Sequence, residues 1–141
     1  MKNTIRKILA LLIIVFTLTS LFACKKTDTD LLWESALYSD SAVLGEGSIS
    51  VDVEVKAGDR SVTFTVKTDK DTLGEALIDN GLIEGEAGAY GLYVKRVNGI
   101  LADYDVDSSY WSFYKNGEYL LTGVDTTYIA DGEHYEIVYT K

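Results

Sequence analysis

Three aspartates at alternate positions are candidates for binding a metal ion. The segment DYDVD holds Asp103, Asp105 and Asp107, and in an extended backbone side chains two residues apart point to the same side. Carboxylate oxygens are the ligands that a hard cation such as calcium prefers. An EF-hand loop would need glycine at position 108 and an acid at position 114, where this chain has Ser108 and Tyr114. The segment therefore predicts a solvated acidic loop, with a looser calcium site as the alternative.

Aromatic residues on both sides of a turn form a second candidate site. Asn116-Gly117 favours a two-residue hairpin turn, because Asn and Gly best tolerate the positive φ angles that this turn needs. The turn sets the register and places Tyr114 opposite Tyr119. Alternation then predicts two faces that are both rich in apolar groups: Trp111, Phe113 and Leu120 on one, and Tyr110, Tyr114, Tyr119 and Leu121 on the other.

Catalytic patterns are missing from the sequence. The one histidine, His134, lies at the predicted start of a strand, where histidine is more often solvated than a general base. There is no nucleophile elbow, no phosphate-binding glycine loop between a strand and a helix, and no zinc-ligand spacing. The sequence therefore predicts a protein that is not an enzyme and requires no cofactor.

The N-terminal residues have the order of a bacterial lipoprotein signal. A cationic start is followed by the apolar run ILALLIIVFTL and then by LFAC, which looks like a lipobox ending at Cys24. Residues 1–23 are therefore predicted to be a signal peptide, with lipid attached to the sulfur of Cys24. Cys24 is the only cysteine, and a lipidated sulfur cannot pair, bind zinc or act as a nucleophile, so disulfides and thiol catalysis are not expected. The predicted location is the outer face of the bacterial cell membrane.

Charge limits the partners of the mature chain. Removing residues 1–23 removes three of the 13 basic residues and no acidic one. The mature chain then has 10 basic and 22 acidic residues, a formal charge of −12. Such a surface repels nucleic acid and anionic lipid headgroups. Cations, or neutral ligands held by stacking and hydrogen bonds, are the expected partners.

The remaining residues divide into a tether, 24–47, and one folded domain, 48–141. Apolar alternation over residues 49–66 predicts an antiparallel hairpin. Residues 71–82 predict a helix, with Thr72 and Glu75 at its start and Gly81 at its end. The glycine-rich residues 84–91 are expected to form a loop before a strand that ends at Asn98-Gly99, and HYEIVYT is the expected last strand. This order predicts an α+β fold, a β-grasp-like roll with one helix packed on a mixed or antiparallel sheet.

A single helix covers only one face of a sheet. One aromatic face of the predicted hairpin therefore lacks a partner, unless loops or the tether cover it. Tyrosine rings with hydroxyl groups at their tips suit a large, flat, partly polar ligand. The alternative is that these rings pack beneath other segments of the same chain.

From residue 71 onward the motifs together resemble the transcobalamin C-terminal-like family, the β-domain of the transcobalamin and intrinsic factor proteins. The matching segments are TLGEALIDNGLI, GLYVKRVNGI, YWSFYKNGEYLLTGV and DGEHYEIVY. The resemblance implies a β-grasp domain that also occurs in lipoproteins of Gram-positive bacteria. In the vertebrate relatives this domain closes over cobalamin held against a helical domain, which this chain lacks.

We therefore expect a non-catalytic, lipid-anchored protein that binds a small ligand. Cobalamin or another corrinoid is the candidate ligand. A transporter or surface protein is the expected partner. The alternatives are a calcium-binding surface protein that uses the acidic loop, or an adhesion module whose tyrosine face meets another protein. The expected ligand-binding residues are Tyr110, Trp111, Tyr114, Tyr119, Val124, Asp125 and Tyr128.

Overall fold

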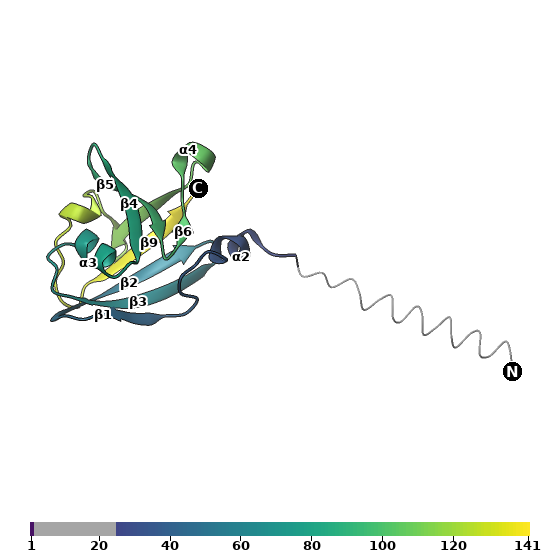
Figure 1. The fold of residues 1–141 in the computed structure, drawn as a ribbon, viewed down its shortest axis with the longest axis horizontal. Helices are drawn as coiled ribbons and strands as arrows, with labels where there is room; N and C mark the ends of the chain where they lie inside the picture. The colour runs from purple at the N-terminus through teal and green to yellow at the C-terminus, as the bar shows by residue number, and fades with distance from the viewer. Residues whose placement is uncertain (2–24) are drawn as a thin grey trace.

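The computed structural model describes Met1 and residues 25–141 (Figure 1). The rest of the predicted signal peptide and the predicted lipidation site, Cys24, lie outside the described residues. Within the described part of the chain, no helix combines the length and the apolar character that crossing a bilayer requires. Among the described residues, the buried apolar core extends from Trp33 to Ile137.

The larger sheet has six strands in the spatial order β1-β3-β2-β9-β7-β8. The last strand of the chain, β9, lies in the middle of this sheet, parallel to β2 and antiparallel to β7 (Figure 1). The strands are β1 Ala42–Gly45, β2 Ile49–Ala57, β3 Arg60–Thr68, β7 Tyr110–Lys115, β8 Glu118–Tyr119 and β9 His134–Thr140.

The predicted hairpin of residues 49–66 is confirmed as β2 and β3. Val53 lies opposite Phe64, and both side chains are fully buried. Val51 and Val55, two residues away on either side, are buried as well, whereas the alternate position Asp52 is exposed. Alternation of apolar and polar residues therefore gives this sheet one buried inner face and one polar outer face.

A second layer covers the inner face of the large sheet. It consists of helix α3, Leu73–Asp79, and a three-stranded sheet of β4, Ile83–Gly88, β5, Gly91–Val97, and β6, Ile100–Leu101. Figure 1 shows α3 and this small sheet on the same side of β2 and β3. The α+β prediction is confirmed, with the addition that a second sheet shares the covering role with the helix.

Helix α3 begins and ends where the sequence predicts. The Thr72 hydroxyl accepts a hydrogen bond from the backbone N–H of Glu75 at 3.3 Å, which satisfies one of the free donors of the first turn. Gly81 has a φ of 65°, the left-handed conformation that ends a helix. Leu73, Ala76 and Leu77 are fully buried, so the predicted apolar stripe faces the core.

The prediction of a loop at residues 84–91 is wrong, because most of that segment is strand β4. It pairs antiparallel with β5, and the register shifts between Glu84 and Gly85. A side chain at Gly85 would have its Cβ 2.3 Å from the carbonyl oxygen of Tyr93, so glycine permits the close approach of the two strands. The strand escaped prediction because its glycines and solvated glutamates give no apolar alternation.

The prediction of a tether at residues 24–47 is wrong for most of its length. Residues Asp28–Trp33 form helix α2, and β1 pairs in parallel with β3 at the edge of the large sheet. Trp33 is buried, its indole Nε1 donates to the carbonyl oxygen of Ala57 at 2.9 Å, and the Arg60 guanidinium lies 4.6 Å from its ring centroid. Both elements are too short to show a periodic pattern, so their packing on the sheet, and not local propensity, stabilises them.

Replacing Trp33 by alanine tests whether this N-terminal segment belongs to the fold. The substitution removes a buried side chain and the hydrogen bond to Ala57, so we expect a loss of about 3–5 kcal/mol in the free energy of unfolding. Urea unfolding of residues 25–141 measures this loss. Leu31→Ala, at an exposed position of the same helix, should change stability by less than about 0.5 kcal/mol. Equal, small effects of the two substitutions would contradict the packing of α2 on the sheet.

Candidate functional site

A groove lies where the small sheet reaches over the strand β7. We call it the aromatic groove; its volume is about 370 Å³, and its walls include Tyr90, Leu92, Trp111, Phe113, Tyr119 and Val124. These residues come from the β4–β5 turn, from β5, from the β7–β8 hairpin and from the segment after it. The groove is therefore assembled from parts of the chain that are distant in sequence.

Trp111 forms the most deeply buried aromatic wall of the groove. Only 6% of its surface is exposed, and its ring lies edge to face against Tyr139 with centroids 5.4 Å apart. Its indole Nε1 is buried and has no hydrogen-bond partner among the described residues. Leaving a buried donor without an acceptor costs about 1–3 kcal/mol. This donor is enclosed by the protein behind the ring surface that Trp111 contributes to the groove.

The 3-10 helix η1, Val124–Thr126, closes one end of the groove and is held against α3. The backbone N–H of Leu73 donates to the carbonyl oxygen of Thr127 at 2.8 Å. A Cβ at Gly74 would lie 3.0 Å from the backbone nitrogen of Asp125, so the absence of a side chain lets the helix approach η1 closely. Gly74 therefore has a packing role that offsets its poor helix propensity.

Asp125 connects η1 to the start of β5. Its carboxylate accepts a hydrogen bond from the backbone N–H of Leu92 at 3.3 Å. Gly91 has a φ of 110°, and a Cβ there would lie 2.6 Å from Oδ2 of Asp125. The carboxylate therefore fills the space beside Gly91 and positions the wall of the groove.

The seven expected ligand-binding residues do not form one cluster. Trp111, Tyr119 and Val124 line the aromatic groove, and Asp125 lies behind it. Tyr128 is exposed beside Thr72, with which it forms an isolated bridge.

Tyr110 and Tyr114 lie elsewhere on the hairpin. Tyr110 lines a different hollow, together with Tyr93 and Tyr104. Tyr114 lies opposite Tyr119, as the predicted register requires, and the two rings meet edge to face with centroids 5.5 Å apart. Tyr119 is 57% exposed, and no described element covers the outer face at this position.

Sequence reasoning missed the walls that β5 and the preceding turn supply. Tyr90 lies in the segment expected to be a loop, and Leu92, Tyr93 and Val94 of the following predicted strand complete that side of the groove. The signal available in the sequence was the pair of tyrosines at positions 90 and 93, close to a predicted strand.

The three aspartates do not have the extended arrangement that the calcium alternative assumes. Residues Tyr104–Asp107 form the short helix α4, and Asp103 caps it by accepting from the backbone N–H of Asp105 at 3.1 Å. Asp107 accepts from the Ser109 hydroxyl at 2.5 Å and from Lys141 at 2.9 Å. These two bonds lower the pKa of Asp107 to about 2. The calcium alternative therefore lacks convergent carboxylates, because Asp103 caps the helical turn while Asp107 bonds Ser109 and Lys141.

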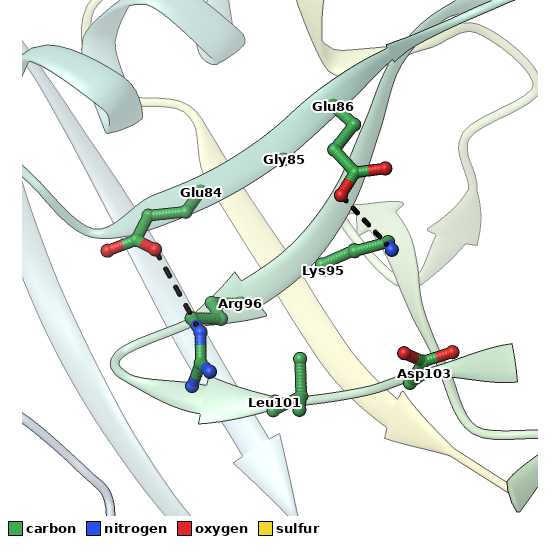
Figure 2. Close-up of a pocket in the computed structure, with 7 residues that line it drawn as sticks. All are labelled: Glu84, Gly85, Glu86, Lys95, Arg96, Leu101 and Asp103. Carbon is green, nitrogen blue, oxygen red and sulfur yellow. Dashed lines mark ion pairs between the residues drawn. The ribbon is translucent and has the colours of Figure 1, made fainter. Parts of the chain in front are cut away.

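Residues 25–141 also contain no other group of three His, Cys, Asp or Glu side chains placed to hold a metal ion. Figure 2 shows the nearest approach to one, on the outer face of the small sheet, where a hollow of about 270 Å³ includes Glu84, Glu86 and Asp103. Glu86 lies 3.2 Å from Lys95, and Glu84 lies 3.9 Å from Arg96. The two cations are adjacent in sequence and reach the same face because of the bulge in this strand pair. This surface is therefore zwitterionic.

Solved structures that are similar to this chain include the two described next, whereas no curated protein matches it. A protein from Ruminococcus gnavus ATCC 29149, suggested by its description to bind metal, is 34% identical with a TM-score of 0.63; the match covers 67% of this chain and 98% of that one. Haptocorrin in complex with Cbi is 24% identical with a TM-score of 0.53, over 66% of this chain. The chain spans only 25% of the length of haptocorrin, so this similarity shows the fold alone.

The haptocorrin match supports the expected transcobalamin-like fold. Residues 70–141 match the family model described as a domain of unknown function, DUF4430. This match includes α3, both walls of the aromatic groove and the central strand β9. The chain therefore belongs to the DUF4430 family.

Proposed function

We propose that this domain is a non-catalytic binding module that holds a small, flat ligand in the aromatic groove. The aromatic lining of a preformed groove is the observation that carries the proposal. The rings of Trp111, Phe113 and Tyr119 add apolar surface for a planar molecule. A few polar groups on a mostly apolar wall are typical of small-molecule sites.

A corrinoid is the specific ligand that we propose. Haptocorrin, which shares the fold, was solved with Cbi bound. A corrinoid is a broad ring with amide groups at its rim, so it combines a flat face for the aromatic walls with polar groups that can stay in water at the open side of the groove. The groove, at about 370 Å³, can hold only part of such a ligand. A second protein, such as a transporter, would then cover the exposed part.

Titration with cobinamide and cobalamin tests this proposal. The variant Trp33→Phe leaves Trp111 as the one tryptophan of residues 25–141, so its fluorescence reports on the groove. We expect quenching that saturates with ligand. Calorimetry should show that Trp111→Phe weakens binding by about two- to tenfold, because it removes part of the aromatic wall of the groove. Tyr128→Leu, at an exposed tyrosine outside the groove, is the matched control and should bind normally. Folded protein that gives no response at high micromolar ligand would refute the corrinoid proposal.

Metal binding is the second candidate, which the Ruminococcus gnavus relative favours. The carboxylates of Asp103, Asp105 and Asp107 do not converge on a metal ion in this structure, because Asp103 and Asp107 form local hydrogen bonds. A ligand of the native state raises stability by about 2.7 kcal/mol at a hundredfold excess over its dissociation constant. We expect melting curves with calcium and with EDTA to coincide. A rise with calcium that Asp105→Asn abolishes would establish the metal site instead.

We also propose that a lipid on Cys24 anchors the domain to the outer face of the cell membrane. The support is the signal-like order of residues 1–24. Cys24→Ser should move the protein from the membrane fraction to the soluble fraction, because the thiol that carries the lipid is lost. A variant that still sediments with membranes would contradict this anchor.

A further inference from the structure

A second hollow, which we call the tyrosine hollow, lies on the outer side of the small sheet. Its volume is about 640 Å³, and it is lined by Tyr93 of β5, Tyr104 and Asp105 of α4, and Tyr110 of β7. All four side chains are exposed or nearly so, and three of them are aromatic. Aromatic rings usually gather in a core, so three rings around one open hollow call for a binding explanation.

Two of the rings are placed to act on the same charge. The centroids of Tyr104 and Tyr110 are 6.5 Å apart, and their planes make an angle of 60°. Because the rings are inclined and not stacked flat, a cation that lies beside the pair can be within about 6 Å of both centroids, the range of cation–π attraction. Tyr93, from the other side of the hollow, supplies a third ring.

The charge around the hollow favours a cation. The carboxylate of Asp105 has no hydrogen-bond or ion-pair partner among the described residues, whereas the neighbouring cations are engaged. Lys95 lies 3.2 Å from Glu86, and Lys141 lies 2.9 Å from Asp107. Asp105 therefore leaves an uncompensated negative charge beside the three rings, on a protein whose formal charge is already −9.

We propose that the tyrosine hollow binds a quaternary ammonium group, such as the trimethylammonium of choline. Such a cation is weakly hydrated and has no N–H group, so it needs no hydrogen-bond acceptor. Aromatic faces and one carboxylate supply the attraction that it requires. A calcium ion would need six or more oxygen ligands, and the hollow offers one carboxylate. A primary ammonium would need three acceptors in place of the rings.

This site is independent of the ligand proposed for the aromatic groove. The two surfaces share only the ring of Tyr93. Trp111→Phe, which alters the groove, should therefore leave ammonium binding unchanged.

Titration of residues 25–141 with tetramethylammonium chloride, followed by NMR of backbone amides, tests the proposal. We expect saturable shifts of the amides of residues 93, 104, 105 and 110 in the millimolar range. Tyr104→Leu and Tyr110→Leu should each weaken binding about two- to fivefold, and Asp105→Asn should weaken it similarly. Tyr128→Leu and Asp59→Asn, which lie outside the hollow, are the matched controls.

Ligand controls separate this proposal from general attraction of cations. The uncharged isostere 3,3-dimethylbutanol should not bind to the hollow, and sodium chloride at equal ionic strength should not reproduce the shifts. Absence of saturable shifts with tetramethylammonium, or equal effects of the control substitutions, would overturn the site. Sedimentation with phosphatidylcholine but not phosphatidylglycerol vesicles would identify a lipid headgroup as the source of the ammonium. Binding of soluble choline without sedimentation would identify a free solute.

Discussion

The placement of β9 between β2 and β7 is the constraint on which the rest of this fold depends. It pairs in parallel with one and antiparallel with the other, so it joins the N-terminal hairpin to the aromatic hairpin. Tyr135 and Ile137 are fully buried at the centre of the inner face. Glu133, just before β9, accepts from the Tyr135 hydroxyl at 2.5 Å and lies 2.5 Å from Lys115 at the end of β7. Burial raises the pKa of Tyr135, and the bond to Glu133 adds to this, so the phenol keeps its proton and donates.

The same sheet determines where binding surfaces can form. Its inner face is covered by α3 and the small sheet, and the aromatic groove opens where that cover ends over Trp111. Its outer face carries charged side chains, such as the Lys56–Glu136 pair, along β2 and β9. Aromatic rings appear on the outer face only toward β7 and β8, within the described residues. Both proposed sites therefore lie at the β7 side of the large sheet, where the second layer, α3 and the small sheet, ends.

Sequence patterns predict the parts of this fold whose geometry is set locally. The alternation of β2 and β3, the register of Tyr114 with Tyr119 and the cap at Thr72 each follow from residues within a short window. Elements stabilised by distant partners were not predictable in this way. Strand β1 exists because β3 offers a free edge, and α2 because Ala57 and Arg60 receive Trp33. Helix α4 forms where alternate aspartates suggest an extended chain, because Asp103 caps its first turn.

The candidate sites show the same division. The hairpin sequence identifies the tyrosines and Trp111, but their neighbours come from β5 and α4, whose positions depend on the packing of the two layers. Tyr110 and Tyr119 are close in the hairpin sequence, yet they line different surfaces, because Tyr110 begins the ribbon and Tyr119 lies beyond its turn. Tyr93 of β5 is the residue that relates the two surfaces, since its ring lines both. The groove and the hollow are therefore adjacent surfaces that have one side chain in common, while the other residues of each wall come from more than one element.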